Sequence, residues 1–138
     1  MNHKLIVIDT NILISAALSP DGTARKALNK VYKEVKIAQS EETYQELSTR
    51  IYKHKFDKYI SDAERQEFLD VVNKYSQFIE ITSQINICRD ADDNKFLDLT
   101  QDTNAEFLIT GDQDLLSLKV LPEYQNKIIT PREFITLD

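Results

Sequence analysis

The sequence predicts an α/β fold built on a central, mainly parallel sheet of about five strands. Short apolar runs alternate along the 138 residues with longer segments of helical periodicity, an order typical of βαβ units. The runs at 5–8 and 107–110 are almost wholly apolar, as in strands that helices cover on both faces. The length and the apolar fraction of 41% are typical of one compact domain, so we expect a single domain over residues 1–138.

The predicted elements follow from these runs and from the residues between them. Strands are expected at 5–8, 35–38, 78–81, 107–110 and 127–130, with the first and fourth central in the sheet. Each expected helix begins at a residue that favours a helix start: Thr23, Ser40, Ser61, Asp92 or Asp93, Asp112 and Pro131. Ser61 and Glu64 match a capping box. In the helix expected to begin at Asp92 or Asp93, Phe96 and Leu97 should point inward and Asp98 should face solvent.

The composition excludes several classes of protein. No apolar run approaches the roughly 20 residues of a membrane-spanning helix, and the run at 5–8 is too short for a signal peptide, so we expect a cytoplasmic protein without membrane contact. The single cysteine, Cys88, excludes an intramolecular disulfide and a cysteine-rich zinc site. The chain has two glycines and no Walker loop, and His3 and His54 flank no Ser or Cys motif.

The net charge of −6 by itself argues against a nucleic-acid partner, because phosphates are bound by basic surfaces. The local distribution of charge is more informative. Two stretches are basic: Arg50, Lys53, Lys55 and Lys58, and Lys26, Lys30, Lys33 and Lys36. For either stretch taken alone, a solvated helix face is the favoured explanation. Acids gather at Asp90, Asp92 and Asp93, so the sequence is compatible with an acidic pocket that has basic flanks.

Two acids follow the two most apolar strands. Asp9 comes directly after 5–8, and Asp112 follows 107–110 after Gly111. Ligands of open α/β sheets bind at the carboxyl ends of the strands, so these carboxylates are expected side by side if the strands are neighbours. For each acid alone, the alternative is a helix cap.

Two further acids lie on predicted helices. Asp93 is expected to face the interior or a cleft, where an unpaired carboxylate costs several kcal/mol. A metal ion would remove that cost, and a helix-start cluster with Arg89 as its partner is an equal alternative. Glu46 precedes the inward-facing Leu47, and an exposed pair with Arg50 is its commoner explanation. Oxygen ligands without His or Cys suit Mg²⁺ or Mn²⁺, which activate water for phosphoryl transfer.

Four segments, which together cover most of the chain, resemble the motifs of PIN domains. Asp9-Thr10-Asn11 directly follows a hydrophobic strand, and Ile109-Thr110-Gly111-Asp112-Gln113-Asp114-Leu115-Leu116 resembles the late strand-to-loop motif of that family. Between them come Ser40-x-x-Thr43-x-x-Glu46-Leu47 and Arg89-Asp90-x-Asp92-Asp93-x-Lys95-Phe96-Leu97. The set is similar to that of VapC-like toxins of toxin–antitoxin systems.

This resemblance implies a three-layer α/β/α sandwich and a metal-dependent site. The acids that match the family's metal-binding quartet, and so its catalytic residues, are Asp9, Glu46, Asp93 and Asp112, with Glu42 as the alternative to Glu46. The auxiliary residues are Asp90, Asp114, Thr10, Asn11 and Thr110. The implied activity is endonucleolytic cleavage of single-stranded RNA with Mg²⁺ or Mn²⁺, by a homodimer that a cognate antitoxin silences. Arg50, Lys53, Lys55 and Lys58 are the candidate RNA contacts.

Two other functions compete with a ribonuclease. One is another Mg²⁺-dependent phosphoryl-transfer enzyme, but a haloacid-dehalogenase-like phosphatase would have a second Asp where Asn11 stands, and a receiver domain would have an acidic pair near position 9. The other is a catalytically silent PIN-like module that binds RNA or protein. Such a module usually lacks one of the acids, and all four are present here.

Overall fold

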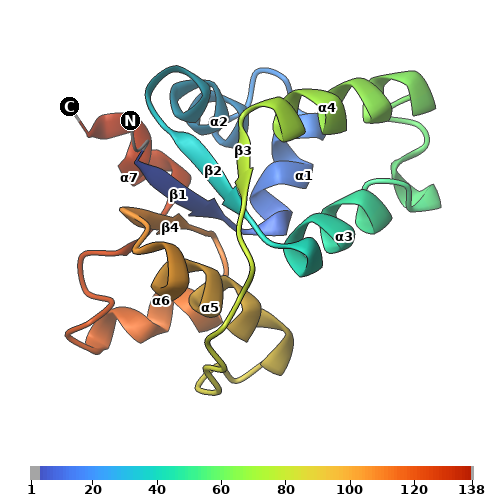
Figure 1. Cartoon of the computed structure of the whole chain (residues 1–138). Helices are drawn as coiled ribbons and strands as arrows, with labels where there is room; N and C mark the ends of the chain where they lie inside the picture. The colour runs from blue at the N-terminus through green and yellow to red at the C-terminus, as the bar shows by residue number, and fades with distance from the viewer. Residues whose placement is uncertain (1–3, 138) are drawn as a thin grey trace.

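Parallel strands form the centre of the computed structural model, which describes residues 4–137. Within this range a sheet of five strands has the order β3-β2-β1-β4-β5 (Figure 1). The strands are β1 Leu5–Ile8, β2 Lys36–Gln39, β3 Ser76–Phe78, β4 Phe107–Ile109 and β5 Ile128–Ile129. Every neighbouring pair is parallel, and β1 lies in the middle, next to β4. The predicted sheet and its central strands are confirmed.

Helices connect the strands and cover both faces of the sheet. The α-helices are α1 Thr10–Leu18, α2 Thr23–Glu34, α3 Glu41–Arg50, α4 Asp62–Lys74, α5 Asn94–Thr103, α6 Gln113–Leu116 and α7 Pro131–Thr136. Short 3₁₀ helices lie at η1 His54–Phe56, η2 Ala91–Asp93 and η3 Ser117–Val120.

The alternation of side chains along β1 separates two hydrophobic cores. Ile6 and Ile8 point to one face of the sheet, where they pack with buried residues of α1 to α4 and α7. Val7 points to the other face and packs with residues of α5 and α6. The chain is therefore a three-layer α/β/α sandwich, as expected.

Most of the predicted helix starts are confirmed, two differ in their capping, and one helix was not predicted. Capping boxes open α3 at Ser40 and α4 at Ser61, Asp112 caps α6, and Pro131 is the first residue of α7. The N-cap of α2 is Gly22, so the prediction that Thr23 caps this helix is wrong. Asp93 precedes α5 without a capping side-chain bond, because η2 already begins the turn there. Helix α1, capped by Asp9, was not predicted.

Side chains of α5 determine the path of the chain that leads into the site. Residues 79–81, predicted as a strand, lie beyond β3 in an irregular segment. Asn94 accepts hydrogen bonds from the N–H groups of Ile87 and Cys88, at 3.2 and 3.0 Å. Asp98 Oδ1 accepts the N–H of Ile85 at 2.7 Å, so the prediction that Asp98 is a solvated surface residue is wrong. One helix turn further on, Asp102 accepts N–H groups of the same segment.

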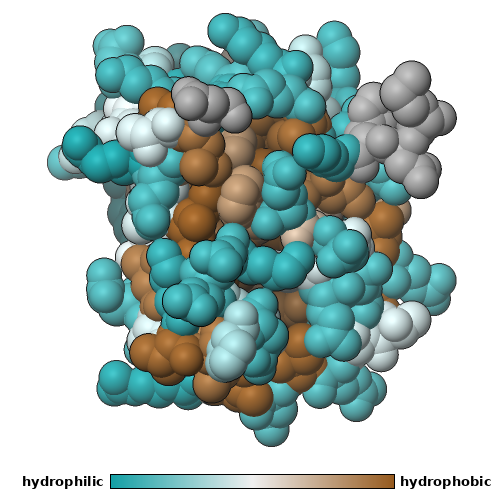
Figure 2. Space-filling view, turned by 90° about the vertical axis from the view of Figure 1, so that its left-hand side faces the viewer, coloured by the Kyte–Doolittle hydropathy of each residue, from teal (hydrophilic) through white to brown (hydrophobic). Residues whose placement is uncertain are grey.

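One face of the molecule is predominantly polar. On the face turned by 90° from Figure 1, polar side chains cover most of the surface and hydrophobic side chains show between them (Figure 2). Among the described residues, none of the helices has the length and apolar character that crossing a membrane requires.

Candidate metal centre

The site lies at the carboxyl ends of β1 and β4. The two strands pair with Ile8 opposite Ile109, so the residues that follow, Asp9 and Thr110, lie side by side. The backbone N–H of Asp9 donates to the carbonyl of Ile109 at 2.9 Å. The expectation that acids after these two strands meet at one edge of the sheet therefore agrees with the structure.

A buried threonine, Thr110, links Asp9 to Asp112. The hydroxyl of Thr110 donates to Asp9 Oδ2 at 2.7 Å and accepts the N–H of Asp112 at 3.0 Å. Thr110 is fully buried, and Asp9 is 3% exposed. The other oxygen of Asp9 accepts the N–H of Asn11 at 3.2 Å. Thr110 thus holds the Asp9 carboxylate and the backbone of Asp112 in a fixed relation.

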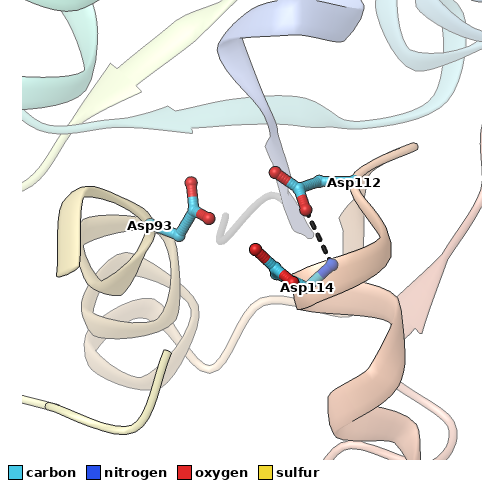
Figure 3. A group of neighbouring side chains, drawn as sticks. All are labelled: Asp93, Asp112 and Asp114. Carbon is cyan, nitrogen blue, oxygen red and sulfur yellow. Dashed lines mark hydrogen bonds between the residues drawn. The ribbon is translucent and has the colours of Figure 1, made fainter. Parts of the chain in front are cut away.

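Three carboxylates, with that of Asp112 among them, converge at this edge of the sheet (Figure 3). One oxygen each of Asp93, Asp112 and Asp114 lies within 4.8 Å of the others. Asp93 comes from the turn before α5, and the other two come from the start of α6, where Asp112 Oδ1 accepts the N–H of Asp114 at 2.7 Å. Among the described residues, the buried Oδ2 atom of Asp93 has no hydrogen-bond partner. A buried carboxylate oxygen without a donor is expected to bind a cation, so these residues fit a hard divalent ion.

The electrostatics of the site also favour a bound cation. Burial, followed by the charges of Asp112 and Asp9, raises the pKa of Asp93 to about 6. Burial also raises the pKa of Asp9, against the lowering effect of its bond from Thr110. Within residues 4–137, no ion pair joins Asp9, Asp93 or Asp112 to a basic side chain. These acids therefore repel one another, and the charge of Lys95, which lowers the pKa of Asp93, offsets this repulsion only in part.

Glu46, the remaining acid of the expected quartet, lies at the margin of the site in ion pairs. Its Oε2 atom is 2.6 Å from Lys95 Nζ and 3.3 Å from Arg50 Nη2. The pair with Arg50 is the alternative to a metal-binding role that the spacing of Glu46 and Arg50 in the sequence suggested. Lys95 was not among the predicted site residues, because its two apolar neighbours, Phe96 and Leu97, mark this stretch of sequence as core. Glu42 is exposed, so it is less suited than Glu46 to a buried site.

The auxiliary residues have distinct positions. Asp114 joins the cluster itself, and Asp90 Oδ1 accepts the N–H of Asp92, which caps the turn that carries Asp93. Asn11 Oδ1 accepts a bond from Arg50 at 3.3 Å. Thr10 is buried as the first residue of α1.

Two of the four basic residues that were expected to contact RNA lie beside the site. Arg50 and Lys53 line a groove of about 440 Å³ between α3 and the start of α5, together with Lys95. The ammonium groups of Lys55 and Lys58 lie instead over the rings of Phe56 and Tyr59, outside that groove.

The unbalanced charge predicts that Asp93→Asn stabilises the metal-free protein. The pKa of Asp93 is raised from 3.8 to about 6, so the folded state binds this proton more tightly than the unfolded chain, and stability falls as pH rises between those values. Above pH 6 the neutral amide should add about 1–2 kcal/mol to the free energy of unfolding, after allowance for solvent screening. Below pH 4 the gain should vanish.

Urea unfolding in EDTA at pH 4 and pH 7 measures this difference. The matched control is Asp70→Asn on the exposed side of α4, which should change stability little at either pH. A gain from Asp93→Asn that is the same at both pH values, or absent at pH 7, would contradict the proposed charge repulsion.

The fold and the site together define an α/β protein with a carboxylate cluster at the carboxyl edge of a parallel sheet. The family model described as "PIN domain" matches residues 5–114. The chain therefore belongs to the PIN domain family, whose members are generally nucleases.

Individual proteins are similar to this chain in sequence or in fold. The uncharacterized protein MJ1680 of Methanocaldococcus jannaschii is 35% identical over 139 residues, which cover 94% of this chain and 88% of that protein. A chain of VapBC2 from Rickettsia felis, crystallised with a DNA fragment from its promoter, has a similar fold, with a TM-score of 0.59 at 18% identity over 91% of this chain and 96% of that one. PAE2754 from Pyrobaculum aerophilum gives a TM-score of 0.57 at 16% identity, over 96% and 88% of the two chains.

Proposed function

We propose that the chain, acting as a single PIN domain, is a metal-dependent endoribonuclease that cleaves single-stranded RNA in the cytoplasm. The observation that carries this proposal is the buried, unpartnered oxygen of Asp93, which lies in the cluster with Asp112 and Asp114. Asp9 stands next to them through Thr110. Membership of the PIN domain family supports a nuclease rather than another phosphoryl-transfer enzyme.

Asp9, Asp93 and Asp112 are the residues that would hold Mg²⁺ or Mn²⁺, with Asp114 beside them. A bound dication supplies an activated water and balances the charge that develops at the phosphate. The chain contributes the fixed positions of the carboxylates: Thr110 orients Asp9, and the cap on α6 orients Asp112. The low exposure of Asp9 keeps bulk water from screening this charge.

The groove beside the site has both acidic and basic walls, and Arg50 and Lys95 are paired with Glu46 there. Lys53, which takes part in none of the ion pairs among the described residues, is the proposed contact with the RNA backbone. Lys53→Glu is expected to weaken RNA binding by about 5- to 10-fold at low salt and to make its salt dependence shallower, since a phosphate contact is lost. Fluorescence anisotropy with labelled single-stranded RNA at several salt concentrations measures both.

Two lysine variants serve as controls for this experiment. Lys55→Glu makes the same change of charge outside the groove and should have a smaller effect, and Lys33→Glu makes it on the exposed side of α2. Equal losses from Lys53→Glu and Lys55→Glu would place the RNA over residues 53–58 instead of in the groove.

A role as the toxin of a toxin–antitoxin pair, as a homodimer silenced by a cognate antitoxin, is part of the same proposal. It is supported by the resemblance of the motifs to VapC-like toxins and by the fold shared with a chain of the VapBC2 complex. Co-purification of the chain with the product of a neighbouring small gene, followed by loss of RNA cleavage in that complex, would test the antitoxin.

The decisive experiment is a cleavage assay on labelled single-stranded RNA with Mg²⁺ or Mn²⁺. We expect endonucleolytic products that disappear with EDTA and in Asp9→Asn. Hydrolysis of p-nitrophenyl phosphate without cleavage of RNA would favour a phosphatase-like enzyme. Binding of RNA without cleavage under any metal would favour a catalytically silent module.

A further inference from the structure

Lys95 is a buried cation at the edge of the acidic site. Its side chain is 6% exposed, and its ammonium group lies 2.6 Å from Glu46 Oε2. It also donates to the carbonyl oxygen of Asp92 at 2.6 Å and lies 3.5 Å from Asp92 Oδ1. Lysine is rarely buried without a partner, and here three oxygen contacts surround its charge.

The charges of the site fall into two halves. In the first half, Lys95 and Arg50 balance two acids, Glu46 and Asp92. The second half holds Asp9, Asp93 and Asp112. As far as the described residues go, these three acids have no ion-pair partner. The protein thus places its close ion pairs in the first half. It leaves most of the charge of the second half, where Asp114 lies 3.9 Å from the exposed Arg89, to an external ion.

We propose that Lys95 takes the place of a second metal ion, so that the site binds a single dication and Glu46 holds Lys95 instead of coordinating that ion. This inference rests on the proposed function, because it presumes that the second half binds a metal. An ammonium group in direct contact with Glu46 occupies the oxygen that a second dication would use, and it would repel a dication placed beside it. Lys95 is therefore a positioning residue that fixes the metal stoichiometry.

Removal of this ammonium group should create room and charge for a second ion. Lys95→Met keeps an unbranched apolar side chain of similar length without the charge. The free Mn²⁺ signal in electron paramagnetic resonance titrations gives the stoichiometry independently of RNA cleavage. We expect one bound Mn²⁺ in the wild type and two in Lys95→Met. The double variant Lys95→Met/Glu46→Gln should return to one, because the second ion depends on the freed Glu46 carboxylate.

Further variants keep the test decisive. Lys119→Met removes a lysine that is paired with Glu133 and with none of the acids of the site, and it should still bind one Mn²⁺. Glu46→Gln in the wild-type background should keep one Mn²⁺ and change its affinity less than about threefold, well below the tenfold that a lost ligand would cost. If circular dichroism shows that Lys95→Met does not fold, Glu46→Gln alone tests whether Glu46 coordinates the ion.

The outcomes separate this inference from the proposed function. Two Mn²⁺ ions in the wild type, one in a folded Lys95→Met, or a loss of affinity in Glu46→Gln as large as in Asp112→Asn would overturn the inference and leave the metal-dependent function intact. A wild-type chain that binds no Mn²⁺ would contradict the proposed function and this inference with it.

Discussion

Asp112→Asn is expected to lower the rate of RNA cleavage by at least about a thousandfold, because it removes a metal-binding charge from the centre of the site. The substitution is small in every other respect. Asn caps helices as well as Asp does, and its side-chain oxygen can still accept the N–H of Asp114, which now lies 2.7 Å from Asp112 Oδ1. The loss should therefore appear in the single-turnover rate at saturating Mg²⁺ and not in the stability of the fold.

Two comparisons make this result specific. Asp70→Asn, on the exposed side of α4, makes the same chemical change away from the site and should cleave RNA like the wild type. RNA binding by Asp112→Asn in EDTA should match that of the wild type, because the groove residues are unchanged. If Asp112→Asn kept more than about a tenth of the wild-type rate, the acidic cluster would not be the site of cleavage.

The sequence alone predicted that Asp9 and Asp112 lie close together, because their positions depend on the topology of the sheet. Asp9 and Asp112 each follow a strongly apolar strand, and parallel neighbours end at one edge, so their proximity followed from pattern. For Asp93, the spacing predicted an inward position but left a metal site and a helix-start cluster equally open, and the resemblance to PIN domains favoured the metal site. The inference for Asp9 and Asp112 needed only the local periodicity and the order of the elements.

The other half of the site contains Glu46 and Lys95. It depends on how α3 and α5 pack side by side, which local periodicity does not encode. The pairing of Glu46 with Lys95 joins residues 49 positions apart on different helices. The shift of β3 has a similar cause: Ile79 and Ile81 alternate with Glu80, a pattern that suggests a strand, yet both lie beyond the end of β3 and pack against the second core. Helix α1 was missed because its apolar residues lie on most of its circumference, which hides the helical period.

Thr110→Val is expected to weaken Mn²⁺ binding by about 10- to 100-fold, although Thr110 would not contact the ion. Its hydroxyl group donates to Asp9 and accepts the N–H of Asp112, so a single buried group fixes two residues of the proposed metal site. Valine has nearly the same shape and should keep the packing of this fully buried position. Without the hydroxyl, Asp9 Oδ2 loses a donor and the backbone of Asp112 loses an acceptor, so both are free to move.

Thr110→Ser provides the matched control, because it keeps the hydroxyl and loses only a methyl group. Calorimetric titration with Mn²⁺ should give near wild-type affinity for Thr110→Ser and the weakened affinity for Thr110→Val. A purely structural role of Thr110 would reverse this order, because deletion of a buried methyl group costs more packing than the exchange of a hydroxyl for a methyl of the same size. Equal Mn²⁺ affinity in Thr110→Val and the wild type would show that Asp9 and Asp112 hold their positions without this link.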